Sequence, residues 1–202
     1  MKITTDPRKA FPRRFVPADA DMGRWDQIEP IGQALLAHRP DSPQALEQWL
    51  EDRGELATCI WEERNRRYIA MTSQTDDPER ERAYLTFVQE IEPKVKPLGH
   101  LLDEAYLQNP HRRALPERYR LLDRVIENRF TLFRQENVPL EVTENELMTE
   151  YQKVTGAMTV VYRGEERTLQ QMAIFLENPD RDMRQEAWEL ITRRRLQDKE
   201  TL

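Results

Sequence analysis

The sequence predicts a mainly α-helical protein, an antiparallel layer or bundle of long helices with one small β-hairpin near residues 158–168. Charged residues make up 34% of the 202-residue chain and apolar residues 38%, a balance typical of helices with charged outer faces. A capping residue followed by proline, a usual helix start, occurs at Ser42-Pro43 and at Asp77-Pro78. Apolar residues then recur at alternate steps of four and three, at Tyr84, Val88, Ile91, Val95, Leu98, Leu102 and Ala105.

This run, which we call the Tyr84–Ala105 seam, places its apolar side chains along one side of a helix. Such a seam has to be buried, and the segments before and after it carry apolar stripes that suit this purpose. Pro93 and Pro97 interrupt the backbone hydrogen bonds but keep the apolar register. We therefore expect a kink or a short break near Glu92–Pro97 within one continuing element.

Three segments follow from these patterns. Residues 1–23 contain several prolines and no periodicity, which predicts an extended arm that docks through Phe11, Phe15 and Val16. Residues 24–140 form the layer of long helices. Residues 141–202 form a short helix, the hairpin and further helices.

Within the layer, the first helix is expected over Trp25–Ala37, with Pro30 either in its first turn or at a kink. The second helix starts at Pro43 and runs to about Thr75. Only a few residues separate it from the helix that Asp77 caps, so we expect these two helices to be antiparallel.

A third long helix is predicted from Pro116 to about Glu136. Asn137 and Pro139 are the residues expected to stop it. Its apolar stripe consists of Tyr119, Leu122, Ile126, Phe130 and Phe133.

The C-terminal segment opens with a capping box, Thr143 with Glu146, which predicts a short helix to about Val154. A β-branched run over Thr159–Tyr162, a glycine turn and a return strand over Glu165–Thr168 predict the hairpin.

Two more helix starts follow the hairpin. A second capping box, Thr168 with Gln171, predicts a helix to about Glu177, and Asn178-Pro179 predicts the start of the last helix. That helix reaches Leu202 without a C-terminal cap, so we expect the chain to be cut from something longer.

The composition argues against several function classes. A net charge of −6 leaves no excess of basic residues for phosphate groups, so no nucleic-acid partner is expected. The basic run Arg193–Arg195 is interpreted as the solvated face of the last helix. No apolar run is long enough to span a membrane, and no secretion signal is found, so no membrane partner is expected. The single cysteine, Cys59, indicates a small buried hydrophobic residue and a reducing compartment, for which we expect the cytoplasm.

No catalytic constellation can be assigned. His38, His100 and His111 lie far apart, and each is interpreted as a helix-end or surface residue. There is no H-E-x-x-H motif, no nucleophile elbow and no glycine-rich phosphate loop, and Cys59 has no nearby histidine in its own helix. We therefore predict no catalytic residue and no metal ligand, and the substrate-binding residues stay unknown. The tryptophans are spaced as anchors of a core, at Trp25, Trp49, Trp61 and Trp188.

Several stretches of the sequence are similar to those of a known family. They are Phe15-Val16-Pro17 with Trp25 and Ile28-Glu29-Pro30; Arg67–Thr72 with Thr75-Asp76-Asp77; Phe133–Leu140; and Gly156–Leu169 with Asp180, Arg181, Arg184 and Ala187. Together they resemble the N-terminal half of oligoendopeptidase F-like zinc metallopeptidases, which are relatives of thimet oligopeptidase. The resemblance covers essentially all 202 residues.

The resemblance implies a mostly helical fold in which two lobes enclose a deep channel. It implies that this chain is the N-terminal lobe of a cytosolic zinc-dependent oligoendopeptidase that hydrolyses short peptides, and that it forms a wall of the substrate channel. Zinc and the catalytic residues belong to the C-terminal half, so none is carried over onto this chain, which we expect to be inactive alone. Its implied partners are its own missing C-terminal catalytic domain and, in the full-length protein, short peptides.

A second interpretation stays open. The chain is then a self-contained helical module for protein interaction or dimerisation, and the Tyr84–Ala105 seam contacts a partner helix.

Overall fold

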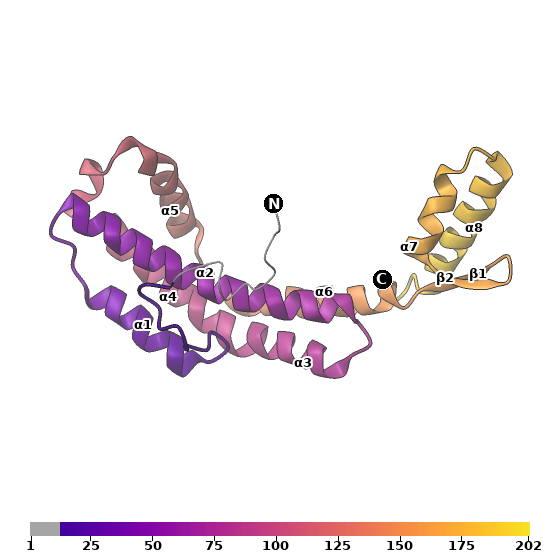
Figure 1. The fold of residues 1–202 in the computed structure, drawn as a ribbon, viewed down its shortest axis with the longest axis horizontal. Coiled ribbons are helices and arrows are strands. Elements are labelled where there is room, and N and C mark those ends of the chain that lie inside the picture. Colours follow the sequence, from indigo (N-terminus) through magenta and orange to yellow (C-terminus); the bar gives the residue numbers. More distant parts are fainter. Residues whose placement is uncertain (1–12) are drawn as a thin grey trace. The chain divides into compact units, whose positions relative to one another are not determined.

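The computed structural model describes residues 13–202. Their fold is mainly α-helical, as predicted, with a two-stranded antiparallel sheet. These residues form two compact units (Figure 1). Unit 1 comprises residues 13–69 and Arg82–Val142, and unit 2 comprises Ala70–Glu81 and Thr143–Leu202. The predicted division at residues 23 and 140 stays a prediction, and Phe11 lies outside the described residues.

The first helices begin where local signals place them. Helix α1 spans Trp25–Ala37 with Pro30 inside it, and α2 spans Pro43–Ser73. The Oγ atom of Ser42 accepts a hydrogen bond from the backbone N–H of Ala45 at 3.2 Å, which confirms Ser42 as the cap of α2.

The cap of the following helix is confirmed as well. The Oδ1 atom of Asp77 accepts from the backbone N–H groups of Glu79 at 2.9 Å and Arg80 at 3.2 Å. The element then continues through α3 (Pro78–Thr86), a π-helical turn η2 (Phe87–Ile91) and α4 (Glu92–Leu107).

The break in this element lies earlier than the sequence predicts. The π-helical turn precedes Pro93, whereas Pro97 lies inside α4 without ending it. Because Pro93 has no N–H for the α-helical bond four residues back, the widened turn accommodates it before the proline itself. The seam is buried as predicted at Tyr84, Val88, Ile91, Leu98 and Leu102.

The core of unit 1 lies between α1, α2 and α4, and α1 and α4 run alongside α2 in Figure 1. Gly32 allows α1 to approach α4 closely, because a Cβ atom at this position would lie 2.5 Å from Cδ2 of Leu98. The indole N–H of Trp49 donates to the carbonyl of Leu35 at 2.9 Å and joins α2 to α1. The core residues include Ile28, Leu35, Leu46, Trp49, Leu56, Phe87, Leu98, Leu102 and Tyr106.

A buried carboxylate anchors part of the predicted arm of residues 1–23. Glu55 accepts hydrogen bonds from the backbone N–H groups of Arg14 at 2.9 Å, Phe15 at 3.0 Å and Val16 at 2.8 Å. Val16 is itself buried in the core of unit 1. Residues 14–16 therefore dock on α2.

The chain after α4 differs from the prediction of one long third helix. Two short 3-10 turns, η3 (Pro110–Ala114) and η4 (Glu117–Tyr119), precede α5 (Arg120–Leu132). The next helix, α6, spans Asn137–Gly156, so the predicted stop at Asn137 and Pro139 is a helix start. Pro139 lies in the first turn of α6, where its missing N–H would have no intrahelical partner in any case. The predicted short helix from Thr143 is the later part of α6.

Unit 2 contains the predicted hairpin. Strands β1 (Thr159–Tyr162) and β2 (Glu165–Thr168) are antiparallel, with Thr159 opposite Thr168. Arg163 and Gly164 connect them with φ values of 53° and 85°, the left-handed conformations that a tight two-residue turn requires.

The helices after the hairpin are shorter or begin later than predicted. The capping box of Thr168 and Gln171 is present, but α7 (Leu169–Met172) gives way to the 3-10 turn η5 (Ala173–Glu177). Asp180 caps α8 (Arg181–Gln197). The predicted cap, Asn178, accepts from the N–H of Asp180 instead and forms the turn before the helix.

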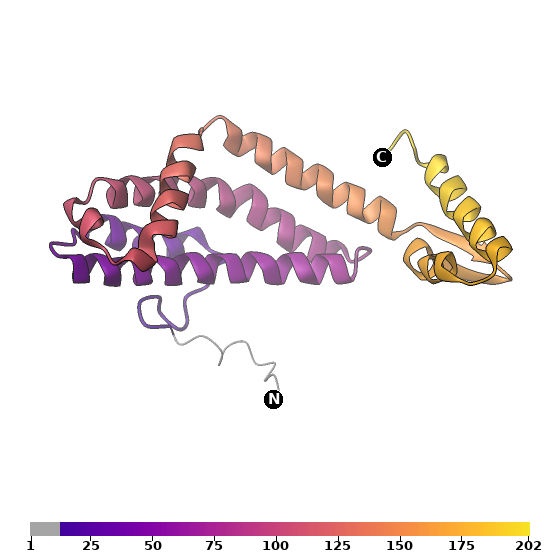
Figure 2. The ribbon, with the colours of Figure 1, turned by 90° about the horizontal axis from the view of Figure 1, so that it is seen from above.

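The interior of unit 2 is small. Tyr162, Met172 and Ala187 form its buried cluster. They belong to β1, α7 and α8, and the hairpin and these two helices lie close together in Figure 2. In the last turn of α6, Lys153 pairs with Glu81 at 2.9 Å and ties the helix to the segment Ala70–Glu81.

Two of the four predicted tryptophan anchors lie at the surface. Trp61 is 54% exposed and Trp188 is 60% exposed, whereas Trp49 is buried. The guanidinium of Arg64 lies over the Trp61 ring, 5.4 Å from its centroid. Trp61 directly follows the buried Ile60, so its side chain lies at the edge of the buried face of α2. There its ring packs under the Arg64 guanidinium.

Candidate functional site

A cavity of about 440 Å³ opens in unit 1 between α2, α4, the end of α5 and the start of α6. This volume falls within the usual range for small-molecule sites, roughly 300–1,000 Å³. Its wall is mainly apolar and consists of Leu56, Ala57, Ile60, Trp61, Val95, Leu98, Leu102, Leu132 and Phe133. Since the seam helix α4 provides three of these side chains, the seam both fills the core and lines the cavity.

One end of the cavity carries a buried ionic cluster. Asp103 is only 1% exposed and forms ion pairs with Arg53 and Arg129. The Nε atom of Arg129 donates to Oδ2 of Asp103 at 2.6 Å, and Nη2 of Arg53 donates to Oδ1. Burial lowers the pKa of Arg53, although Asp103 acts in the opposite direction. The hydrogen bond to Asp103 raises the pKa of Arg129.

The opposite end of the cavity is neutral. Lys96 forms an ion pair with Glu141 of α6 and lies 3.8 Å from a carboxylate oxygen of Glu92. Glu92 also pairs with Arg64 of α2. These ion pairs join α2, α4 and α6 beside the apolar wall.

The three histidines lie in different places, as predicted, but one of them is not at a helix end. His38 is the exposed C-cap of α1, and His111 lies in the first turn of η3. His100 lies in the middle of α4 and lines the cavity. Its ring stacks between Phe130, with centroids 4.6 Å apart, and Phe133, with centroids 4.4 Å apart.

The physical reason for this difference is a long-range contact. The two phenylalanines belong to α5 and the residue that follows it, so the periodicity of α4 alone gives no sign of the stack.

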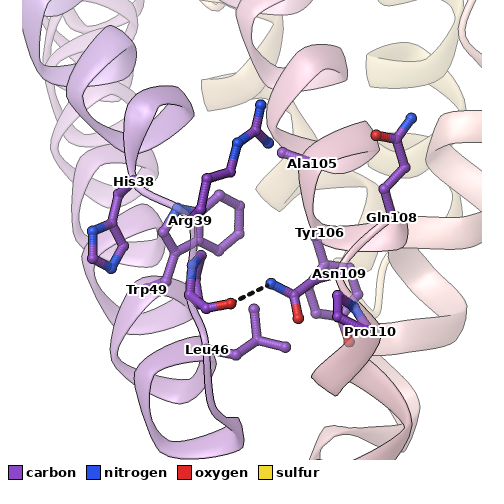
Figure 3. Close-up of a pocket in the computed structure, with 10 residues that line it drawn as sticks. His38, Arg39, Leu46, Trp49, Ala105, Tyr106, Gln108, Asn109 and Pro110 are labelled. Carbon is purple, nitrogen blue, oxygen red and sulfur yellow. Dashed lines mark hydrogen bonds between the residues drawn. The ribbon is translucent and has the colours of Figure 1, made fainter.

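A smaller cavity of about 200 Å³ lies at the other end of α4, near the start of α2 (Figure 3). Its polar groups join the loop between α1 and α2 to the loop that follows α4. The Nδ2 atom of Asn109 donates to the carbonyl of Pro40 at 3.1 Å, and Oδ1 of Asn109 accepts from the backbone N–H of His111. The pocket therefore marks a structural junction, and the larger cavity is the stronger candidate site.

The zinc ion that the family resemblance implies does not fit the residues described here. Residues 13–202 contain no group of three or more histidine, cysteine, aspartate or glutamate side chains placed to hold a metal ion. Cys59 is buried as a free thiol, and burial raises its pKa, which confirms the prediction of a small buried hydrophobic residue.

Within the part of the chain that the structure describes, each helix is too short or too polar to cross a lipid bilayer.

The chemistry that the larger cavity offers is recognition. Its wall combines apolar side chains with guanidinium, ammonium and carboxylate groups, and it includes no serine, threonine or cysteine. Sequence reasoning placed Leu98 and Leu102 on the seam but did not identify Arg53, His100 or Asp103 as a site. One local signal in the sequence points to this site, namely a charged residue directly beside a seam position, such as Asp103 after Leu102.

Comparisons with known proteins define how far the likeness extends. No protein-family model matches the sequence, and no curated protein matches it. Among solved structures, one described as PZ peptidase A with inhibitor 2 matches this chain with a TM-score of 0.77 and 24% sequence identity. The match covers 95% of this chain and 33% of that chain, so this chain spans about a third of the length of the matched peptidase.

These findings correct the family assignment made from the sequence. The prediction of an oligoendopeptidase F or thimet oligopeptidase-like family member is wrong, because no family model supports it and the structural likeness is to PZ peptidase A. At 24% identity this likeness shows a shared helical fold and no closer relationship. The chain has the fold of part of a peptidase.

Proposed function

We propose that this chain is the N-terminal, non-catalytic lobe of a peptidase and forms one wall of the channel that admits peptide substrates. The observation that carries the proposal is the fold match, which extends over 95% of this chain but only 33% of the peptidase chain. In this proposal the partners are the catalytic part of the same peptidase and short peptides. We place the lobe in the cytoplasm, because its single cysteine is a buried free thiol, as a reducing compartment favours.

The polar interior of unit 1 supports a structural role for this lobe. Glu55 binds three backbone N–H groups, and Asp103 is held by Arg53 and Arg129. Peptide-bond cleavage requires an activated nucleophile or a metal-bound water. The buried thiol of Cys59 has a raised pKa, which makes it a poor nucleophile.

The test is peptide hydrolysis by the 202-residue chain alone, measured on internally quenched peptides with and without added zinc chloride. We expect no turnover above the buffer blank under either condition. A Leu98→Asp variant purified in the same way is the control, because a contaminating protease would remain active when this chain is unfolded. Turnover that requires zinc, disappears with a chelator and is lost in Leu98→Asp would overturn the non-catalytic role.

The seam no longer favours the interaction-module alternative. Tyr84, Val88, Ile91, Leu98 and Leu102 are buried within this chain, so they are not available to a partner helix. Size-exclusion chromatography with light scattering distinguishes the two functions. A lobe of a larger enzyme is expected to elute as a monomer, and a stable dimer with a cooperative melt would favour the module instead.

A further inference from the structure

We infer that the larger cavity of unit 1 binds a medium-chain aliphatic monocarboxylate, with the carboxylate at the Arg53–Asp103–Arg129 end and the tail against the apolar wall. Such a site goes beyond the proposed peptidase role, because it uses only residues of unit 1 and needs neither a peptide nor the catalytic part of a peptidase. Three features support it: a single excess positive charge, a buried donor without an acceptor, and an apolar wall of suitable length.

The charges that line the cavity leave an excess of one positive charge at one end. At the α6 end, Lys96 and Glu141 neutralise each other. At the other end, Asp103 faces two guanidinium groups, those of Arg53 and Arg129. Asp103 is 1% exposed and the Arg53 side chain 11% exposed, so solvent screens the charge on Arg53 weakly, whereas the Arg129 side chain is 55% exposed at the mouth of this end. The cavity therefore favours a ligand with a single negative charge.

Arg53 also has a hydrogen-bond donor that no acceptor among the described residues engages. Its Nη2 atom is engaged with Asp103, whereas its buried Nη1 atom has no hydrogen-bond partner among residues 13–202. His100, which lines the same cavity, has a buried Nδ1 atom that likewise lacks a partner there. A buried donor without an acceptor destabilises the protein, and an acceptor on a ligand removes this cost. A carboxylate is the group that matches a guanidinium best.

The apolar wall indicates what the rest of the ligand is made of. From Val95 to Leu102 the wall follows two turns of α4, about 10 Å at the usual rise of an α-helix. Leu56 and Ile60 of α2 extend this apolar surface beside it. A peptide would bring backbone amides that this wall cannot hydrogen-bond, whereas an unbranched hydrocarbon tail has no polar group to satisfy. A medium-chain acid is thus favoured over a peptide.

The first experiment compares three head groups on the same tail with the full chain. Decanoate, decan-1-ol and decylamine are titrated separately while methyl resonances of the cavity leucines and isoleucine are followed by NMR. We expect saturable one-to-one binding of decanoate, binding of decan-1-ol at least tenfold weaker, and no saturable binding of decylamine. Equal binding of all three, or no saturable binding of decanoate, would overturn the assignment.

A pair of glycine substitutions separates loss of the cavity from loss of the fold. Gly99 lines the cavity, and Gly54 does not, yet a Cβ atom at either position would meet nothing within 4 Å. Both lie in helices, so replacement by leucine raises helix propensity at each. We expect Gly99→Leu to abolish decanoate binding and Gly54→Leu to leave it unchanged, with neither melting temperature lowered. Wild-type affinity in Gly99→Leu would contradict the site.

Arg129→Gln tests the charge argument. It removes the excess positive charge, while Asp103 keeps its ion pair with Arg53. We expect decanoate affinity to fall at least tenfold, to the level of decan-1-ol, and decan-1-ol affinity to stay within twofold. If the preference for the carboxylate persists in a folded Arg129→Gln protein, the excess charge does not select the ligand and the proposal fails.

Discussion

The two units each bury a tyrosine, and the two tyrosines differ in whether the hydroxyl group has a hydrogen-bond partner. In unit 1, Tyr106 is 1% exposed and its hydroxyl donates to Oδ1 of Asp123 at 2.9 Å. In unit 2, Tyr162 is 2% exposed, and its buried hydroxyl has no hydrogen-bond partner among the described residues. Unit 1 thus provides an acceptor for its buried tyrosine hydroxyl, whereas unit 2 leaves its buried tyrosine hydroxyl without one among the described residues.

The same contrast holds for charges. Unit 1 buries Glu55, Glu92 and Asp103, and each has a partner far away in the sequence. Unit 2 has its ion pairs near the surface, as between Lys153 and Glu81. Buried ion pairs fix which elements meet, because breaking one leaves an uncompensated charge. Buried charges therefore determine which elements pack together more strongly in unit 1 than in unit 2. Unit 1 is also the part with the cavity.

The largest effect is expected from a charge placed in the interior of unit 1. Leu98 packs against Gly32 and lies in the seam, so Leu98→Asp buries an unpaired carboxylate and removes core volume. We expect the free energy of unfolding to fall by at least about 4 kcal/mol, measured by urea denaturation with circular dichroism. Leu147→Asp on the exposed face of α6 is the control and should change it little. An unchanged melt for Leu98→Asp would show that the seam does not carry the fold.

The anchor of residues 14–16 should give the next largest effect. Glu55→Ala leaves three backbone N–H groups without their acceptor, and we expect a loss of about 3 kcal/mol. Limited trypsin digestion should cleave after Arg14 faster in this variant than in the wild-type protein. Glu51→Ala, one turn earlier on the exposed side of α2, should show neither change. Equal cleavage rates in both variants would contradict the anchor.

The two tyrosines provide the direct comparison of the units. Tyr106→Phe removes a hydrogen bond to a carboxylate and is expected to cost about 1.5 kcal/mol of unfolding free energy. Tyr162→Phe removes a hydroxyl that has no partner in the described residues, so stability should change by less than about 0.5 kcal/mol or rise slightly. A loss in Tyr162→Phe as large as in Tyr106→Phe would remove the contrast between the units.

The smallest effect is a dependence of stability on pH. The hydrogen bond from Arg112 lowers the pKa of Asp123, so this carboxylate adds stability above its ordinary pKa and loses it as the pH falls through the lowered value. Arg112→Gln should therefore flatten the decrease in stability between about pH 4 and pH 2, by less than about 1 kcal/mol. Arg120→Gln, which breaks an exposed pair with Glu117, should leave the acid profile as it is. A wild-type acid profile in Arg112→Gln would contradict this assignment.

Local signals in the sequence predicted much of the fold. Ser42 and Asp77 cap helices, and the turn at Arg163-Gly164 forms a hairpin, because each structure depends on neighbouring residues alone. Asn137 and Pro139 were misinterpreted, since asparagine with proline soon after it is compatible with both the end and the start of a helix.

The candidate site could not be predicted in this way. Arg53 and Asp103 are separated by 50 positions, and Asp103 and Arg129 by 26. These residues come together only because α2, α4 and α5 pack against one another. Helix periodicity predicts which face of a helix is buried, but not which helix packs against that face. The seam predicted that α4 is buried, but not that part of its surface borders a cavity.

The most direct test of the non-catalytic lobe is an exchange between two proteins. A chimera in which residues 13–202 replace the matched third of PZ peptidase A is assayed on short quenched peptides, next to the same chimera with Leu98→Asp. If this segment provides fold and channel wall but no bond-cleaving residue, the chimera should retain peptidase activity, and the Leu98→Asp chimera should lose it together with its cooperative melt. A chimera that folds cooperatively but cleaves no peptide would contradict the account.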